Sequence, residues 1–217
     1  MVDAVLFDLD GTFADTAPDL GEALNHVRAL RDLAPLPLEV IRPQASHGSR
    51  GLLKLGLGIE PGAPDYEPLR EAFLQHYQAH LCDRSKVFPG ISALVAELDQ
   101  RDMPWGIVTN KPHRYTVPLV EKLGYATRAA CLVSGDTCAE AKPHPAPLLY
   151  AAELMGVDTR RCLYLGDDLR DMQAAQAANM IGVIAAYGYL AANTELRDWP
   201  AAGSVQTPFA LLRYLSL

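Results

Sequence analysis

The stretch AVLFDLDGT at residues 4–12 decides how the rest of the chain is interpreted. Its first four residues are apolar without interruption, which is typical of a strand covered on both faces in a parallel sheet. Asp8 and Asp10 follow directly, and Gly11 and Thr12 complete a turn. An Asp-Gly turn closed by threonine is common and indicates no function by itself. At the end of a buried strand, however, two carboxylates two positions apart can converge on one cation and one reacting centre.

Four further short apolar runs repeat the pattern of the first and alternate with segments of helix length. The predicted strands are residues 4–8, 105–109, 130–134, 162–166 and 181–185. The predicted helices are residues 91–101, 115–123, 146–155 and 169–178. This alternation predicts an α/β fold, a doubly wound Rossmann-like parallel sheet whose ligands bind at the carboxyl ends of the strands.

The segment from residue 15 to about residue 85 interrupts the alternation and contains no convincing strand. The apolar positions of a first predicted helix, behind Pro18, are Leu20, Leu24, Val27 and Leu30. Those of a later helix are Leu69, Phe73, Tyr77 and Leu81. We expect a helical domain at 15–85, inserted into an α/β core formed by 1–14 and 86–217.

Composition and charge exclude several classes of protein. The chain has 217 residues, of which 49% are hydrophobic, and a net charge of −7. A sequence-independent nucleic-acid binder needs a basic surface, so that class is excluded. The four cysteines form no Cys-x-x-Cys pair, which predicts free thiols in a reducing compartment. The acidic N-terminal residues do not resemble a signal peptide, and the uncharged stretch 172–194 is too polar for a membrane span, so we expect a cytoplasmic protein without membrane partners.

Polar residues also stand at the ends of other predicted strands. Thr109 and Asn110 follow the second strand, Lys142 lies in the loop after the third, and GDDLRD at 166–171 follows the fourth. A hydroxyl and backbone amides can hold phosphate oxygens. Three acidic residues within five positions repel one another unless a cation lies among them. Oxygen ligands suit a hard divalent cation, and we expect Mg²⁺.

In this combination and order the chain resembles the haloacid dehalogenase superfamily of phosphotransferases, over essentially its whole length. The resemblance implies that Asp8 is a nucleophile that forms an aspartyl-phosphate, and that Asp10 is first the general acid and then the general base. It implies phosphate contacts from Thr109 and Lys142. The implied Mg²⁺ ligands are Asp8, the backbone carbonyl of Asp10, Asp167 and, in support, Asp171. Whether Asp168 contacts the metal stays open.

The inserted helical domain resembles the cap of this family, which closes over the active site. Gly11, Thr12 and Asn110 are candidate substrate contacts in the core, and Arg50 is a candidate in the cap, where it can clamp a carboxylate or a phosphate. The alternative interpretation of Arg50 is a surface arginine in a glycine-rich turn.

The expected function is Mg²⁺-dependent hydrolysis of a small phosphate monoester. Within the superfamily the chain is similar to the phosphoglycolate phosphatase group and to bacterial N-acetylmuramic acid 6-phosphate phosphatases, the second of which implies peptidoglycan recycling. Both substrates carry a carboxylate that Arg50 can hold. One alternative is a sugar phosphomutase similar to β-phosphoglucomutase. A non-catalytic binding module of the same fold predicts the loss of site residues, and none is missing. Monomer and homodimer both stay open.

Overall fold

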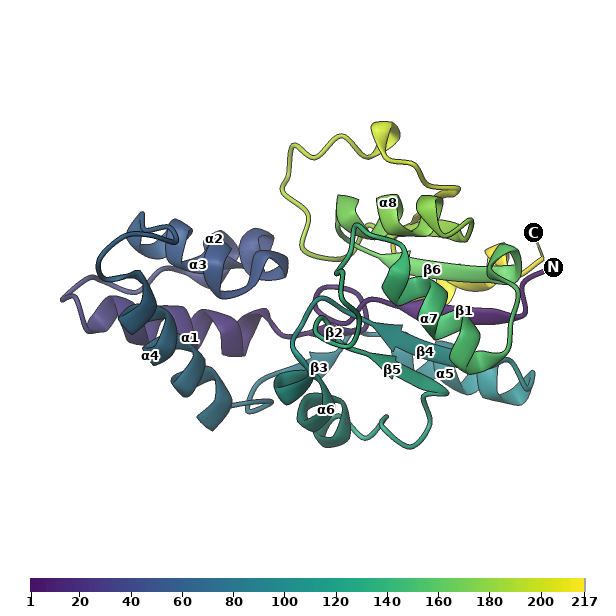
Figure 1. The fold of residues 1–217 in the computed structure, drawn as a ribbon, viewed down its shortest axis with the longest axis horizontal. Coiled ribbons are helices and arrows are strands. Elements are labelled where there is room, and N and C mark those ends of the chain that lie inside the picture. The colour runs from purple at the N-terminus through teal and green to yellow at the C-terminus, as the bar shows by residue number, and fades with distance from the viewer. Residues whose placement is uncertain (217) are drawn as a thin grey trace. The chain divides into compact units, whose positions relative to one another are not determined.

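The computed structural model describes residues 1–216, and the chain divides into two compact units. Unit 1 comprises Met1–Ala14 and the chain from Val87 onward, and unit 2 comprises Asp15–Lys86. Two short strands, β2 (Ala14–Asp15) and β3 (Lys86–Val87), pair where the chain leaves unit 1 and where it returns. The units are described separately below, and Figure 1 shows the elements of both.

Unit 1 is built on a parallel sheet of six strands in the order β5-β4-β1-β6-β7-β8. The strands are β1 (Ala4–Phe7), β4 (Trp105–Val108), β5 (Cys131–Val133), β6 (Cys162–Gly166), β7 (Ile181–Ala185) and β8 (Gly203–Val205). Both β1 and β6 are buried along their whole length, as their uninterrupted apolar sequence predicts. The predicted α/β class with a parallel sheet is confirmed, and β1 lies at its centre between β4 and β6.

Helices cover this sheet on both faces. The helices of unit 1 are α5 (Ile91–Gln100), α6 (His113–Lys122), α7 (Ala146–Met155) and α8 (Leu169–Ala177), with the 3₁₀ segments η2 (Thr159–Arg161), η3 (Leu196–Asp198) and η4 (Pro208–Tyr214). Alternate residues of β1 and β6 pack in one cluster with α7 and α8, and α8 runs along β6 in Figure 1. Within residues 1–216, no helix is both long enough and apolar enough to cross a membrane.

The opposite face of the sheet carries an aromatic cluster. Phe7 on β1 and Trp105 on β4 meet edge to face, with ring centroids 6.1 Å apart. Phe13, from the turn after β1, stacks on Trp105 at 5.7 Å and packs edge to face against Phe7 at 5.6 Å. Because Phe13 anchors the turn that contains Asp8 and Asp10, the position of those carboxylates is tied to the core.

Unit 2 is a small helical unit with its own apolar core. Its elements are α1 (Ala17–Ala29), α2 (Leu38–Ile41), η1 (Arg42–His47), α3 (Gly48–Leu57) and α4 (Tyr66–Ala79). Leu24 of α1 packs against α3 so closely that a methyl group on Gly56 would overlap its side chain. Phe73 and Tyr77 of α4 are buried as their spacing predicts. Asp19, although charged, is buried and accepts hydrogen bonds from the backbone amides of Arg84 and Ser85 at 2.8 and 3.0 Å.

Some details of the elements differ from the prediction. Leu30 and Leu81 were placed on the apolar faces of two helices, and this is wrong, because α1 ends at Ala29 and α4 ends at Ala79. Leu30 is 57% exposed, whereas Leu81 is buried beyond the end of its helix. Strand β8 was missed, because its three residues, Gly-Ser-Val, are too few to show a hydrophobic pattern.

Candidate active site

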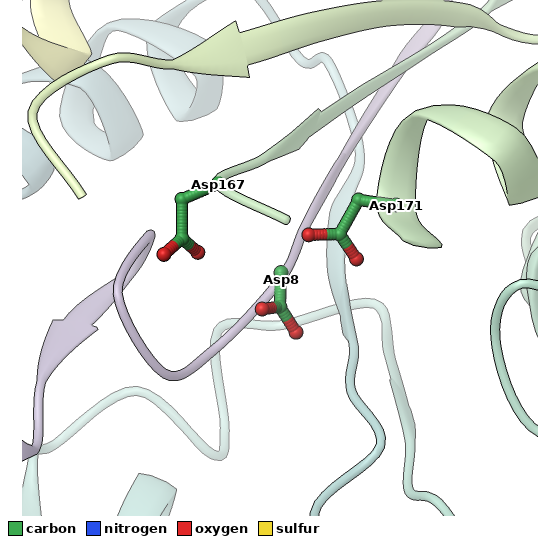
Figure 2. Close-up of side chains that lie close together, drawn as sticks. All are labelled: Asp8, Asp167 and Asp171. Carbon is green, nitrogen blue, oxygen red and sulfur yellow. The ribbon is translucent and has the colours of Figure 1, made fainter. Parts of the chain in front are cut away.

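Three buried aspartates from two neighbouring strands and one helix form the centre of the candidate site. Asp8 follows β1, Asp167 follows β6 and Asp171 lies in the first turn of α8. One carboxylate oxygen from each residue lies within 4.8 Å of those of the other two. Figure 2 shows the three carboxylates around one common space, with Asp8 between Asp167 and Asp171. Since β1 and β6 are adjacent and parallel, their carboxyl ends place Asp8 and Asp167 at the same edge of the sheet.

A buried lysine holds two of these aspartates. The Lys142 side chain is 3% exposed, and its Nζ donates to Asp8 Oδ1 at 2.8 Å and to Asp171 Oδ1 at 2.7 Å. Lys142 comes from the loop between β5 and α7, so a third segment of the chain converges on the same point. A buried ammonium is tolerated only when it is paired, and here two carboxylates pair with it.

The phenol of Tyr164, on β6, completes the surroundings of the Lys142 ammonium. Lys142 Nζ donates to Tyr164 Oη at 2.6 Å, and Tyr164 Oη in turn donates to the carbonyl oxygen of Val108 at 2.8 Å. An ammonium has three hydrogens, which suffice for Asp8, Asp171 and the phenol oxygen. The phenol hydrogen then satisfies Val108, which also lies 3.0 Å from Lys142 Nζ. The strand predicted from Cys-Leu-Tyr-Leu-Gly gave no sign of this role, because a tyrosine in an apolar run is usually core.

Replacing Tyr164 by phenylalanine tests this arrangement through stability. The variant removes a buried hydroxyl that accepts from Lys142 and donates to Val108, while the carbonyl oxygen of Val108 stays within reach of Lys142 Nζ at 3.0 Å. We expect the free energy of unfolding to fall by about 0.5–1.5 kcal/mol, the net contribution of one buried hydrogen bond. Urea denaturation measures this. Tyr150→Phe, at an exposed position of α7, is the matched control and should change stability by less than about 0.5 kcal/mol. Equal effects in the two variants would refute the role given to the phenol.

Asp167 is fixed by the turn after β1 and by the segment after β7. Thr12 Oγ1 donates to Asp167 Oδ1 at 2.8 Å, and the backbone N–H of Tyr189 donates to Oδ2 at 2.9 Å. Gly11 has a φ of +88°, and any side chain there would overlap the Asp167 carboxylate. Thr12 and Gly11, expected as substrate contacts, therefore act on Asp167, and the hydroxyl of Thr12 is fully buried. The role of Tyr189 is not visible in the sequence, because a backbone donor leaves no trace in the residue type.

Asp168 is the cap of helix α8. Its side chain accepts from the backbone N–H of Arg170 at 2.8 Å, and Asp171 Oδ2 accepts from the backbone N–H of Asp168 at 3.0 Å. The Arg170 guanidinium binds both oxygens of Asp168, each at 2.8 Å. This reciprocal capping fixes Asp171 at the N-terminus of the helix and directs the Asp168 carboxylate to Arg170.

Burial and like charge raise the pKa of two aspartates of the cluster, Asp8 and Asp167. Burial raises the pKa of Asp8 from 3.8 to about 7; the Lys142 ammonium opposes this and the Asp171 charge adds to it. Burial raises the pKa of Asp167 well above its ordinary value, and the negative charges of Asp8 and Asp171 act in the same direction. Burial by itself lowers the pKa of Lys142, but Asp171 and Asp8 outweigh it, so that this pKa lies above its ordinary value. The Lys142 ammonium therefore stays charged, and it is the positive charge that Asp8 and Asp171 share.

Thr109 and Asn110, at the end of β4, lie beside the same loop. Thr109 is buried, and its Oγ1 accepts from the backbone N–H of Lys111 at 3.1 Å. The amide of Asn110 donates to the carbonyl oxygen of Lys142 at 2.8 Å and accepts from the N–H of Lys142 at 3.0 Å. Asn110, expected as a substrate contact, thus fixes the backbone that carries Lys142. The peptide bond between Lys142 and Pro143 is cis.

Asp10 and Arg50 complete the set of sequence-predicted residues. Asp10 lies in unit 1, in the turn after β1, and its Oδ1 accepts from Lys111 Nζ at 2.9 Å. Arg50 lies in unit 2, exposed on helix α3, and not in a glycine-rich turn.

The donor set of the cluster fits a hard divalent cation. The carboxylates of Asp8, Asp167 and Asp171 together with the Lys142 ammonium leave two negative charges in excess when all four groups are ionised. One divalent cation would compensate that excess. Oxygen donors without histidine or thiolate favour Mg²⁺ over softer metals. When bound, such an ion would supply charge neutralisation for phosphate oxygens at this edge of the sheet. Within residues 1–216 this is the only group of carboxylate, imidazole or thiol ligands with metal-binding spacing.

Comparison with known sequences gives matches along almost the whole chain. The sequence profile of haloacid dehalogenase-like hydrolases matches residues 5–185. The N-acetylmuramic acid 6-phosphate phosphatase of Pseudomonas aeruginosa is 38% identical over 212 residues, which cover 98% of this chain and 94% of that protein. The phosphoglycolate phosphatase of Xanthomonas campestris is 42% identical over 205 residues, which cover 94% and 92%.

Solved structures match the fold. A protein from Haemophilus somnus, titled a predicted phosphoglycolate phosphatase, superposes with a TM-score of 0.84 at 24% identity and covers 100% of this chain and 98% of its own. The CbbY protein of Rhodobacter sphaeroides, in complex with phosphate, has a TM-score of 0.76 at 22% identity, with both chains covered completely. At such identities the likeness concerns the fold.

Proposed function

Because this chain belongs to the haloacid dehalogenase-like hydrolase family, we propose that it hydrolyses a small, carboxylate-bearing phosphate monoester through an aspartyl-phosphate on Asp8. The chain is an enzyme of the phosphatase type, as the names of its relatives indicate. The observation that carries the finer proposal is the environment of Asp8. This buried carboxylate ends the central strand, is held by the Lys142 ammonium, and faces the carboxylates of Asp167 and Asp171.

In the first proposed step, a carboxylate oxygen of Asp8 attacks the phosphorus atom in line with the ester oxygen. The bond from phosphorus to the ester oxygen breaks, and Asp10 donates its proton to that oxygen as the alcohol leaves. Lys142, which is fixed on Asp8, stabilises negative charge on the phosphoryl oxygens, and Thr109 and the backbone after β4 contribute donors. The products of this step are the alcohol, an aspartyl-phosphate and the carboxylate of Asp10.

In the second proposed step, Asp10 takes a proton from water as the water oxygen attacks the phosphorus atom. The bond between phosphorus and the Asp8 oxygen breaks, which releases orthophosphate and restores both carboxyl groups to their starting states. One residue can serve as acid and then as base, because the first step leaves it in the state that the second requires. Mg²⁺, held by Asp8, Asp167, Asp171 and the backbone carbonyl of Asp10, is the proposed cofactor.

The proposed substrates follow the two groups of relatives, whose names give 2-phosphoglycolate and N-acetylmuramic acid 6-phosphate. Each ester carries a carboxylate beside the phosphate. We propose unit 2 as the cap that selects between them, with Arg50 as the contact for the carboxylate, and we place the enzyme in the cytoplasm. Turnover of the amino-sugar acid would give it a role in peptidoglycan recycling.

Phosphate release from the two esters, side by side with Mg²⁺, tests this substrate class. We expect one of them to give a kcat/KM of about 10⁴ M⁻¹ s⁻¹ or more, the lower end of the usual enzyme range. p-Nitrophenyl phosphate, which lacks the carboxylate, serves as the reference ester and should be a poorer substrate. If neither ester outperforms it, the proposed substrate class is wrong. If a sugar phosphate is isomerised without release of orthophosphate, the enzyme is a mutase.

Removal of divalent cations tests the proposed cofactor by a second readout besides activity. EDTA should abolish phosphate release, and Mg²⁺ should restore it. Because the ion would relieve two excess negative charges in a buried cluster, saturating Mg²⁺ should also raise Tm, by the equivalent of about 2.7 kcal/mol at one hundred times its Kd. Asp167→Asn should lose most of this rise, whereas Asp198→Asn, at an exposed position, should keep it. A wild-type Tm that does not respond to Mg²⁺ would contradict the assignment.

A further inference from the structure

A second lysine reaches the catalytic turn, and sequence reasoning gave it no role. Lys111 lies three residues beyond the end of β4, and its Nζ donates to Asp10 Oδ1 at 2.9 Å. The two side chains are 7% and 14% exposed, so the pair is largely withdrawn from water. Lysine is almost never buried to this extent unless a partner holds it. The contact is therefore a built feature of the turn and not a surface ion pair.

Both ends of this ion pair are fixed by the backbone. The N–H of Lys111 donates to Thr109 Oγ1 at 3.1 Å, and its carbonyl oxygen accepts from Thr116 Oγ1 and from the N–H of Gly135, each at 2.9 Å. Asp10 follows β1, which is paired in parallel with β4. The Lys111 ammonium therefore has a defined place beside Asp10.

Each of the two lysines forms an ion pair with one aspartate of the sequence Asp8-Leu9-Asp10. Lys142 holds Asp8 from the side of the three-aspartate cluster, and Lys111 holds Asp10. An ammonium is a donor only, so the oxygen that it binds, Oδ1 of Asp10, acts there as an acceptor. A proton that Asp10 gives to or takes from another molecule is then carried on its other oxygen, Oδ2.

We propose that Lys111 is a positioning residue that holds Oδ1 of Asp10 and so presents Oδ2 for proton transfer to the leaving alcohol and from water. This inference rests on the proposed function, because it needs Asp10 to be the acid and base of a phosphatase. It assigns Lys111 no contact with the substrate. The competing role for a buried ammonium at this edge is direct binding of a substrate anion, and the two roles differ in measurable ways.

The test compares Lys111→Met with the wild-type enzyme on whichever carboxylate-bearing ester proves to be the better substrate. A misplaced catalytic group costs up to about 10²-fold in rate, so we expect kcat to fall by about that factor while KM stays within about threefold. On p-nitrophenyl phosphate, whose leaving group needs no proton, kcat/KM should change by less than about threefold. If Lys111 instead bound a substrate anion, Lys111→Met would raise KM for the carboxylate-bearing ester and leave kcat unchanged.

A double-mutant cycle with Asp10→Asn decides between the two roles. If Lys111 acts only through Asp10, Lys111→Met should have no further effect on kcat/KM for the carboxylate-bearing ester in the Asp10→Asn background. If the two losses multiply, the inference is overturned. Lys122→Met, the same substitution at an exposed position of α6, is the matched control and should leave activity unchanged. Circular dichroism verifies the fold of each variant.

Lys111→Gln keeps the test informative if the methionine variant does not fold. Its amide can donate to the same oxygen without the charge, so it should retain more of the wild-type kcat than Lys111→Met, and Lys111→Arg should retain most of it. A Gln variant with wild-type KM and reduced kcat supports positioning, whereas one with raised KM and full kcat overturns it. Wild-type enzyme that releases no phosphate from any ester would instead refute the proposed function, and with it this inference.

Discussion

Asp8→Asn should abolish phosphate release, with kcat reduced by about 10⁴-fold or more, the scale on which the loss of a catalytic nucleophile falls. The amide keeps the size and the place of the carboxylate but cannot form the acyl-phosphate bond. It also removes a negative charge from a buried cluster in which the pKa of Asp8 is raised to about 7, so the variant is not burdened by a new uncompensated charge. The loss should therefore appear in kcat while the protein stays folded. Steady-state phosphate release measures it.

Asp3→Asn is the matched control for this result. Asp3 lies one residue before the same strand, at its amino end, where its side chain pairs with Arg161 on the surface. The substitution is chemically identical and should leave kcat within about twofold of wild type, since surface changes away from special features have small effects. If Asp8→Asn keeps more than about one hundredth of the wild-type kcat, Asp8 is not the nucleophile.

Lys142→Met should lower both activity and stability. Its ammonium holds Asp8 and Asp171 and lies beside the place where the phosphoryl oxygens would gather, so its loss should reduce kcat by at least about 10²–10³-fold, as the loss of one preorganised donor does. Removal of one partner from a buried ion pair also costs about 3–5 kcal/mol, because the other charges remain. Urea denaturation and phosphate release measure the two effects.

Lys54→Met provides the comparison for Lys142→Met. Lys54 pairs with Glu60 on the exposed surface of unit 2, where an ion pair is worth less than about 1 kcal/mol. Should Lys142→Met prove too unstable to purify, Lys142→Arg keeps the charge with a different shape and should fold better yet remain slow. A Lys142→Met enzyme whose kcat lies within about tenfold of wild type would contradict the role given to this ammonium.

The core of the fold was predictable because uninterrupted apolar strands are a strong signal. The runs that end at Asp8, Thr109 and Asp167 are buried on both faces, and each ends at one edge of the sheet. That regularity, together with the topology rule for parallel sheets, is enough to bring Asp8 and Asp167 together before any coordinates are known. Lys142 was harder, because a loop lysine is solvated in most proteins, and only the resemblance to the haloacid dehalogenase superfamily implied a role for it.

The supporting contacts of the site were not predictable, because they depend on directions that residue types do not encode. Thr12 and Asn110 were expected to contact substrate, yet one hydroxyl is directed to Asp167 and one amide to the backbone of Lys142. Tyr164 resembled a core residue and Lys111 was given no role, yet Tyr164 is hydrogen-bonded to Lys142 and Lys111 to Asp10. Long-range side-chain contacts of this kind are set by the packing of several segments, which no single segment shows.

The most direct test of the account is whether the phosphoryl group becomes bonded to Asp8 during turnover. Wild-type enzyme is mixed with Mg²⁺ and excess substrate, quenched in acid within the first turnovers, digested and analysed by mass spectrometry. The account predicts that the peptide containing Asp8 gains the mass of one phosphoryl group, that borohydride reduces the acyl-phosphate at that residue, and that Asp8→Asn shows neither. Full turnover with no phosphorylated Asp8, or with the phosphoryl group on another residue, would contradict it.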